Sequence, residues 1–190
     1  MKKFILAAAM TALMSGTALA ANIGVSMALF DDNFLTALRN GMVAQAKGME
    51  GVNLQVEDAQ NDVAKQLDQI KNFIASGVDA IIVNPVDTSA TQAMSDAAAA
   101  ANVPLVYVNR EPINVDTLPD NQAFVASNEA DSGTLETIEV CAQLKAAGKD
   151  NANVYIMQGE LSNQAAVQRT ADIPDVMACL LYTSAAADDL

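Results

Sequence analysis

One stretch decides the fold that the sequence predicts: Ile23-Gly24-Val25-Ser26-Met27-Ala28-Leu29-Phe30-Asp31-Asp32-Asn33-Phe34-Leu35. Its apolar part, residues 23–29, is typical of a strand that is buried on both faces. Residues 35–47 then carry apolar side chains at the three- and four-residue spacing of a helix. The two aspartates and Phe34 therefore lie at the carboxyl end of a buried strand, where open α/β sheets bind their ligands.

Asp31 and Asp32 allow two interpretations. One of them caps the helix by accepting hydrogen bonds from the free amides of its first turn. Capping accounts for one carboxylate, but not for the second or for the ring of Phe34 so close to both. Carboxylates that accept hydroxyl protons, beside a ring that covers C–H groups, suit a sugar or a cyclitol. The stretch alone leaves both interpretations open.

The first 20 residues have the pattern of a bacterial export signal. Lys2 and Lys3 give a positive start, residues 4–14 form an apolar centre, and Ala18-Leu19-Ala20 is a small-residue cleavage site. We predict cleavage after Ala20 and a periplasmic location for the mature chain. The apolar centre is too short to span a bilayer as an anchor.

The 190-residue chain has a formal charge of −13, and removal of Lys2 and Lys3 makes it more negative. This charge disfavours binding to nucleic acid or to anionic lipid. The chain contains no His, which excludes imidazole bases, His-based catalytic triads and most zinc sites. We expect a monomer that uses no cofactor and no metal ion.

The two cysteines, Cys141 and Cys179, are expected to reach an oxidising compartment. A disulfide between them is compatible with that compartment, but the sequence does not fix the distance between them. Neither cysteine has a neighbouring base that would activate it as a nucleophile. The sequence therefore leaves the pairing open.

Strand patterns and helix patterns alternate along the chain. We predict strands at residues 23–29, 52–57, 80–83, 105–108 and 153–157, and helices at residues 35–47, 63–76, 89–101 and 131–147. Strands that are connected by crossover helices lie parallel to one another. The predicted fold is therefore α/β, with a doubly wound parallel sheet.

Candidate ligand-binding side chains follow three of these strands, at the point where each strand ends. They are Asp31, Asp32 and Phe34 after the first strand, Asn84 after the third, and Asn109 and Arg110 after the fourth. Because the carboxyl ends of parallel strands share one edge of a sheet, we expect these side chains to lie close together. Simpler roles stay open: Asn84, before a proline, also suits a turn. Arg110 also suits a surface ion pair with Glu111 or a neighbouring acid, and Arg169 suits a solvated helix face.

Four longer segments extend this pattern. They are Asp31-Asp32-Asn33-Phe34, Asp58-Ala59-Gln60-Asn61-Asp62, Ile82-Val83-Asn84-Pro85-Val86-Asp87 and Val103-Pro104-Leu105-Val106-Tyr107-Val108-Asn109-Arg110-Glu111-Pro112. In their order and spacing the chain resembles the type I periplasmic sugar-binding proteins of bacterial ABC importers, from the predicted cleavage site to about Ala178. The first and fourth segments are most similar to the galactose/glucose-binding and inositol/rhizopine-binding members.

The resemblance implies roles for individual residues. Asp32 would accept hydrogen bonds from ligand hydroxyls, and Phe34 would stack on the ligand ring. Asn109 would hydrogen-bond further hydroxyls, with Arg110 beside it. Arg169 would donate hydrogen bonds from the opposing lobe.

The resemblance also bears on the ligand. Galactose-binding members have His and Asp where this chain has Asn163 and Ala165, so an acceptor for one sugar hydroxyl is missing. Residues 164–166 are more similar to the cyclitol-binding branch. Residues 148–151 are too few for the calcium loop of galactose-binding members. We therefore expect an inositol-like ligand, contacted in part by Asn163.

Members of that family clamp their ligand between two lobes, each of about 150 residues. By the resemblance, residues 1–20 are the signal peptide, residues 21–127 the N-terminal lobe and residues 128–178 the start of the C-terminal lobe. Residues 179–190 have neither helical nor strand periodicity, and we interpret them as a non-native or run-out tail. We expect half of a binding site and impaired closure.

The resemblance favours a protein that delivers a sugar or cyclitol to the membrane permease of an ABC importer. A sensor that presents the same ligand to a chemoreceptor uses the same closed form, and that alternative stays open. A carboxylate-based glycosidase is disfavoured, since adjacent residues do not flank a bond from opposite sides. A repressor with this fold is disfavoured by the export signal and by the lack of an N-terminal DNA-reading helix-turn-helix pattern.

Overall fold

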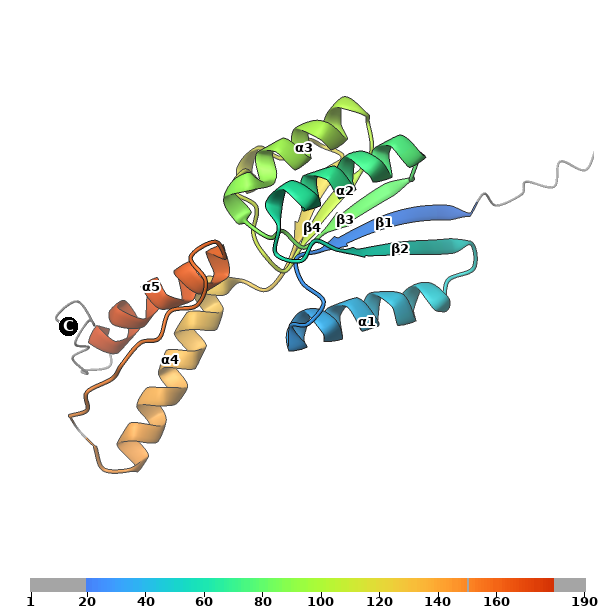
Figure 1. The fold of residues 1–190 in the computed structure, drawn as a ribbon. Helices are drawn as coiled ribbons and strands as arrows, with labels where there is room; N and C mark the ends of the chain where they lie inside the picture. Colours follow the sequence, from blue (N-terminus) through green and yellow to red (C-terminus); the bar gives the residue numbers. More distant parts are fainter. Residues whose placement is uncertain (1–19, 150, 180–190) are drawn as a thin grey trace, which may run out of the picture.

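A computed structural model describes residues 20–149 and 151–179 and centres on one parallel sheet (Figure 1). The strands are β1 (Ala21–Met27), β2 (Val52–Asp58), β3 (Ala80–Val83), β4 (Leu105–Val108) and β5 (Gln122–Val125). Their order in the sheet is β2-β1-β3-β4-β5, and every neighbouring pair is parallel. The predicted α/β class with a doubly wound parallel sheet is confirmed.

Helices cover both faces of the sheet. α1 (Asn33–Lys47) lies on one face, and α2 (Val63–Ser76) and α3 (Thr91–Ala100) lie on the other (Figure 1). Short 3₁₀ turns, η1 (Thr88–Ala90) and η2 (Val115–Thr117), lie in the connections before and after β4. Because helices cover both faces of the sheet, the side chains on both faces of β1, β3 and β4 are largely shielded from water, which explains why these strands are mainly apolar in the sequence.

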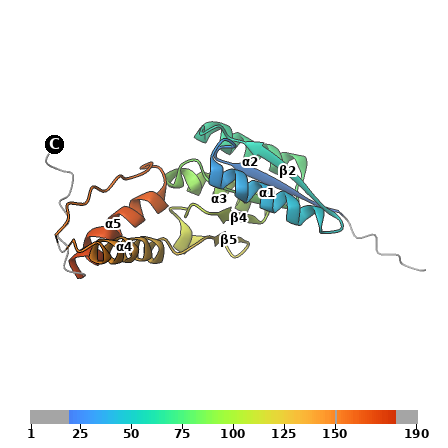
Figure 2. The ribbon, with the colours of Figure 1, turned by 90° about the horizontal axis from the view of Figure 1, so that it is seen from below.

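A second unit, the α4–α5 unit, lies beside the sheet rather than on it. α4 (Glu129–Ala146) and α5 (Gln164–Cys179) pack against each other along their length (Figures 1 and 2). Buried Cys141 and Met177 meet between them, with Leu144 and Ile173 packed around. The chain enters this unit only three residues after the last strand of the sheet, so the two units are joined by a short connection.

Four of the described α-helices, α1, α2, α4 and α5, begin directly after an aspartate or asparagine. The side chains of Asp32, Asp62 and Asn128 accept hydrogen bonds from backbone amides in the first turns of α1, α2 and α4. For this reason α1 begins at Asn33, two residues before the start that apolar spacing predicts. At its other end α2 stops at Gly77, which has the left-handed conformation that glycine adopts without strain (φ 75°).

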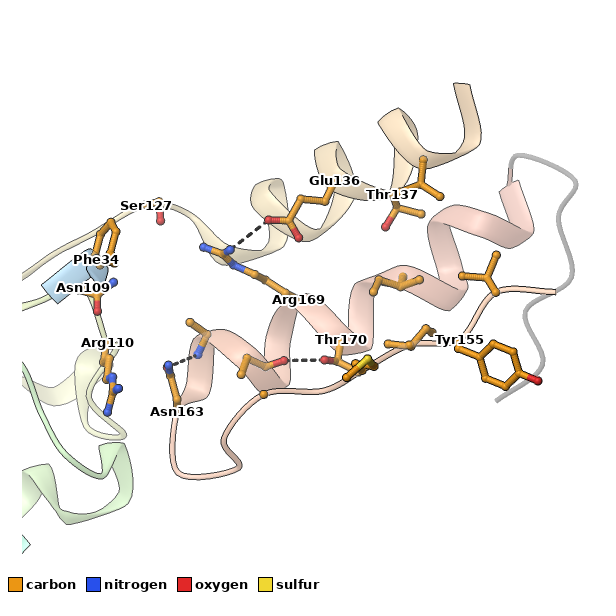
Figure 3. A pocket seen from close by; sticks show the side chains of 18 of the residues that line it. Phe34, Asn109, Arg110, Ser127, Glu136, Thr137, Tyr155, Asn163, Arg169 and Thr170 are labelled. Carbon is orange, nitrogen blue, oxygen red and sulfur yellow. Dashed lines mark hydrogen bonds and ion pairs between the residues drawn. The ribbon is translucent and has the colours of Figure 1, made fainter. Parts of the chain in front are cut away.

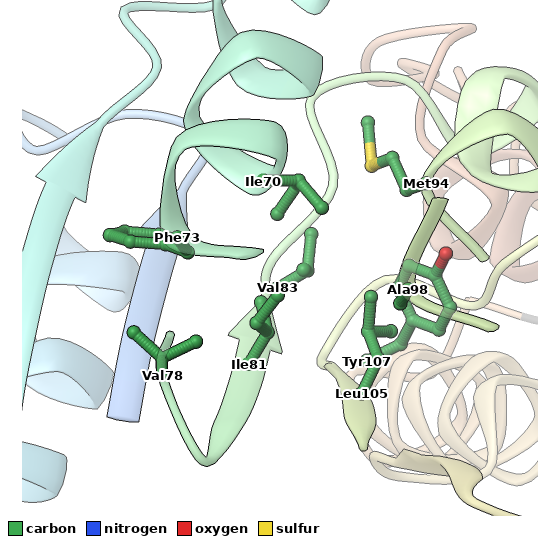
Figure 4. Packing of buried hydrophobic residues seen from close by; sticks show 9 residues of the cluster. All are labelled: Ile70, Phe73, Val78, Ile81, Val83, Met94, Ala98, Leu105 and Tyr107. Carbon is green, nitrogen blue, oxygen red and sulfur yellow. The ribbon is translucent and has the colours of Figure 1, made fainter. Parts of the chain in front are cut away.

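The largest core cluster lies between β3, β4, α2 and α3 (Figure 4). It consists of Ile70, Phe73, Val78, Ile81, Val83, Met94, Ala98, Leu105 and Tyr107. Phe73 also lies over Gly24 of β1, where an added Cβ atom would be 2.5 Å from the ring. Helix α2 therefore packs this close to the sheet because residue 24 has no side chain.

The strand predicted at residues 153–157 is not observed, and that prediction was wrong. Residues 152–160 have no regular secondary structure, and Tyr155 and Met157 are 80% and 94% exposed. A strand needs a hydrogen-bonded neighbour, and none of the described strands pairs with this segment. Alternating hydrophobicity predicts which side chains can be buried; it does not supply the pairing partner.

Two further expectations fall largely outside the described residues. They concern the export signal, of which only Ala20 is described, and the tail, of which only Cys179, the last residue of α5, is described. Within residues 20–149 and 151–179, no helix has the length and apolar character that crossing a membrane requires.

We predict that Gly24→Ala destabilises the chain. The new methyl group would clash with the buried ring of Phe73, and such overpacking costs about 1–3 kcal/mol. Gly41→Ala is the matched control, because a Cβ atom at this exposed position of α1 meets nothing within 4 Å. It should raise the free energy of unfolding by about 0.5–1 kcal/mol. Urea denaturation followed by circular dichroism measures both, and equal stability of the two variants would contradict the packing described.

Candidate functional site

The candidate site lies at the carboxyl edge of the sheet. The ends of β1, β3 and β4 are neighbours there, as predicted, because the strand order places β3 between β1 and β4. From β1 the chain leaves to β2 on one side and later returns to β3 on the other. Such a reversal of direction opens a crevice at the strand ends, which is the usual ligand site of open α/β sheets.

Asn84, which follows β3, ties these ends together rather than facing the crevice. Its side chain is fully buried. Its Oδ1 accepts from the amide of Ala28 (3.4 Å), and its Nδ2 donates to the carbonyl of Val108 (3.2 Å) and to Oδ1 of Asn109 (3.1 Å). Buried Gln66 donates to the backbone carbonyl of Asn84 (3.0 Å). The ends of β1, β3 and β4 are thus joined through one side-chain amide.

Asn109 receives its orientation from this network. The carbonyl of Val108 only accepts hydrogen bonds, so the atom of Asn84 that faces it is the amide nitrogen. That nitrogen also donates to Asn109, so Asn109 presents its oxygen to Asn84 and keeps its Nδ2 group for the other side. Its backbone is left-handed (φ 68°), a conformation that asparagine tolerates better than most residues. Asn109 therefore offers a donor to the crevice.

Asp32 serves as the N-cap of α1 and also reaches the crevice. Its Oδ1 accepts from the amide of Leu35 (2.7 Å), and its Oδ2 accepts no hydrogen bond within the described part of the chain. Phe34, two residues further along the chain, exposes 60% of its surface. Asp31 is exposed and does not line the cavity described below. Capping by Asp32 is thus confirmed, and because it uses a single oxygen, contact of the same residue with a ligand stays a prediction.

Arg110 is buried at the end of β4. Its Nη1 donates to the carbonyls of Pro85 (3.1 Å) and Val86 (3.0 Å). Its Nη2 lies 3.8 Å from Oε2 of Glu160, in the loop before α5. Burial lowers the pKa of Arg110 below its ordinary value, and the charges of Glu160 and Asp32 oppose that shift. The partner is thus Glu160 across the two units, not Glu111 as the sequence also allowed.

The α4–α5 unit contributes Asn163 and Arg169. Asn163 caps α5, because its Oδ1 accepts from the amide of Ala165 (3.1 Å), and its Nδ2 makes no hydrogen bond within the described residues. Arg169, in the second turn of α5, donates from Nε to Glu129 (2.5 Å) and from Nη1 to Glu136 (3.1 Å). The hydrogen bond to Glu129 raises the pKa of Arg169 above its ordinary value, although burial opposes this.

A cavity of 720 Å³ lies between the sheet and the α4–α5 unit. Of the predicted site residues it is lined by Asp32, Phe34, Asn109, Arg110, Asn163 and Arg169, whereas Asp31 and Asn84 do not line it. Figure 3 shows Phe34, Asn109 and Arg110 on the sheet side and Arg169 and Asn163 on the helical side. The structure therefore brings six of the eight predicted residues to one cavity.

Several residues that hold the arginines of this cavity leave little signal in the sequence. Glu129 and Glu136 hold Arg169, and Glu160 faces Arg110. An acidic residue in the first turn of a helix, such as Glu129, is common because its negative charge interacts favourably with the helix dipole. Its presence therefore does not by itself indicate a site. Only the spacing of Glu129 and Glu136, which places both on one face of α4, was available as a signal.

Cys141 and Cys179 lie on α4 and α5, which pack against each other. Cys141 is buried in the contact between these helices. The side chain of Cys179 lies outside the described part of the structure. Whether they pair stays open, as it does from the sequence.

A family model described as a periplasmic binding protein domain matches residues 23–184. The chain belongs to this family. A relative from Rhizobium meliloti, named as a candidate rhizopine-binding protein, is 63% identical over 178 residues, which cover 94% of this chain and 56% of the relative. The ribose import binding protein of Bacillus subtilis is 33% identical over 129 residues, or 67% of this chain and 40% of that protein.

Among solved structures, a similar one is an ABC transporter solute-binding protein from Bacillus halodurans with bound myo-inositol. It is 33% identical to this chain, with a TM-score of 0.77 over 90% of this chain and 59% of that protein. The type I periplasmic binding protein fold, expected from the resemblance, is thereby confirmed. The chain spans about half the length of the relatives that it matches.

We predict that Asn84→Ala lowers the free energy of unfolding by about 1–3 kcal/mol, because the buried amide of Ala28 loses its partner. Asn53→Ala removes an asparagine from the exposed side of β2 and is the matched control, with an expected change within about 0.5 kcal/mol. Urea denaturation measures both. A loss of stability at residue 53 as large as that at residue 84 would contradict the role assigned to Asn84.

Proposed function

We propose that this chain is part of a periplasmic solute-binding protein that captures a sugar or cyclitol, preferably an inositol-like one, for an ABC importer. The observation that carries the proposal is the exposed ring of Phe34 beside the unused carboxylate oxygen of Asp32, at the mouth of a cavity. A single exposed aromatic side chain is ordinary on a protein surface, but the ring of Phe34, 60% exposed, lines the same cavity as the carboxylate of Asp32. A polyol ring suits both groups, with C–H groups for the aromatic face and hydroxyl protons for the carboxylate.

The other groups at the cavity fit the same ligand class. Asn109 and Asn163 each keep an amide nitrogen as a donor, because their oxygens are used within the protein. Arg169 keeps its Nη2, since only Nε and Nη1 form hydrogen bonds in the described structure. Hydroxyl groups both donate and accept, so a polyol can satisfy a carboxylate on one side and amide donors on the other.

The preference for an inositol-like ligand rests on two kinds of support. Asn163 and Ala165 stand where the galactose-binding branch has His and Asp, so the acceptor for a sugar hydroxyl is missing. A relative at 63% identity is named for rhizopine binding, and a structural neighbour at 33% identity contains myo-inositol. For this chain we propose only the ligand class, a six-membered polyol ring, and not an identified molecule.

The proposed location is the periplasm, with the signal peptide cleaved after Ala20, and the proposed partner is an ABC permease. Presentation of the same ligand to a chemoreceptor is the second candidate, because both partners recognise a ligand-closed form. We assign no catalytic role: one oxygen of Asp32 is used as a helix cap, and Arg169 neutralises Glu129 and Glu136. Within the proposal, Asn84 acts by orienting Asn109, and Asp31, which does not line the cavity, makes no contact with the ligand.

We predict that Asp32→Asn and Phe34→Ala each weaken myo-inositol binding by about 1.5–3 kcal/mol, through a lost charged hydrogen bond and a lost ring contact. Asparagine keeps the capping oxygen, so the first variant removes charge without unfolding α1. Asp31→Asn removes the same charge one residue away, outside the cavity, and should bind as the unchanged chain does. Isothermal titration calorimetry measures the affinities. Equal losses in the Asp31 and Asp32 variants would contradict the site.

We also predict that Asn163→Asp changes the order of preference among myo-inositol, galactose, glucose and ribose. The aspartate keeps the oxygen that caps α5, but it replaces the free amide donor by an acceptor. The melting temperature of the empty chain should therefore stay the same while ligand-induced shifts change order. A thermal-shift panel measures both. An unchanged order would mean that residue 163 does not contact the ligand.

A further inference from the structure

Arg169 is held by α4 more firmly than its exposure suggests. Its side chain is 40% exposed, yet two of its nitrogen atoms are engaged by carboxylates of α4. Nε donates to Oε2 of Glu129 at 2.5 Å, and Nη1 donates to Oε1 of Glu136 at 3.1 Å. Because the guanidinium is planar, hydrogen bonds at two of its nitrogens fix the plane of the whole group. The third nitrogen, Nη2, is then fixed as well.

The two carboxylates differ in how they are held. The Glu136 side chain is 60% exposed, whereas that of Glu129 is 5% exposed. The other oxygen of Glu129 accepts from the hydroxyl of Ser127 (2.9 Å), in the connection from β5 to α4. A buried carboxylate with both oxygens engaged has a single orientation, so the better anchor for the guanidinium is Glu129.

Gly133 brings the backbone of Arg169 within reach of this anchor. An added Cβ atom at Gly133 would lie 3.0 Å from Cα and from the carbonyl oxygen of Arg169. Glu129, Gly133 and Glu136 follow the spacing of one helix face, so the two carboxylates flank the point of closest approach. This face of α4 therefore holds Arg169 of α5 between the two carboxylates.

We propose that Glu129 is a positioning residue that fixes the guanidinium of Arg169 at the cavity, so that Nη2 meets the ligand in one orientation. The part that concerns the ligand rests on the proposed function. The fixed orientation does not, because it follows from contacts within the chain. Glu129 itself does not line the cavity and acts only through Arg169.

The first test needs no ligand. The chain contains three arginines, Arg39, Arg110 and Arg169, so their Nε–H resonances are separable by NMR, and Arg169→Lys assigns one of them. In the unchanged chain the Arg169 resonance should be shifted downfield and exchange slowly with water. Glu129→Met, which keeps the length of the side chain but has no oxygen, should return this resonance to the position of a solvent-exposed arginine. Glu129→Gln, which keeps one acceptor oxygen, should give an intermediate shift.

Asp131→Asn is the matched control. It removes one negative charge from the same helix turn, but from an exposed side chain that touches neither Arg169 nor the cavity. The control should leave the Arg169 resonance unchanged. A resonance that is the same in Glu129→Met as in the control would overturn the proposal. If Glu129→Met does not fold, the exchange rate measured in the unchanged chain decides. An Arg169 Nε–H that exchanges with water as fast as that of a free arginine also overturns the proposal.

The second test measures myo-inositol affinity by calorimetry in the same variants. Glu129→Met should lower the affinity at least tenfold, Glu129→Gln less, and Asp131→Asn less than twofold. An unchanged affinity in Glu129→Met, in a chain that binds myo-inositol, would contradict the positioning role. If the unchanged chain binds no myo-inositol, the failure lies with the proposed ligand binding by this chain and not with the positioning role, and the NMR result alone then supports or overturns the fixed orientation of Arg169.

Discussion

The buried amide of Asn84 is the interaction on which the site depends. It accepts from the turn after β1 and donates to the end of β4 and to Asn109, so three strand ends keep their relative positions through one side chain. Gln66 of α2 supports it from behind, by donating to the carbonyl of Asn84 and accepting from the amide of Val86. Buried polar groups that satisfy one another in this way fix geometry, because any displacement leaves a partner without water to replace it.

The α4–α5 unit is tied to this edge by contacts of a different kind. Arg110 lies 3.8 Å from Glu160, and Thr88 donates its amide and its hydroxyl to the carbonyl of Ser162 (3.2 and 3.3 Å). These contacts involve short loops and one exposed carboxylate, so they are weaker than the network around Asn84. Relative motion of the two units is therefore easier than rearrangement of the sheet edge, which is the property that a ligand clamp requires.

Much of the fold follows from local patterns in the sequence. The strands at residues 80–83 and 105–108 were predicted with the observed bounds, and the convergence of Asp32, Asn109 and Arg110 follows from the rule that crossover connections make strands parallel. Glu129 and Glu160 were missed because their partners lie 40 and 50 residues away, where no periodic pattern reports a contact. The strand at residues 153–157 was predicted wrongly because its pattern contains no information about a pairing neighbour.

The proposed ligand contacts both the sheet edge and the α4–α5 unit. A titration of the isotope-labelled chain with myo-inositol, followed by backbone amide NMR, tests it most directly. If one ligand contacts both units, amides around Asp32, Asn109 and residues 163–169 should shift together and with one affinity, while those of β2 and of the distant end of α4 should not. Shifts confined to one unit, or an absence of saturable shifts in both, would contradict it.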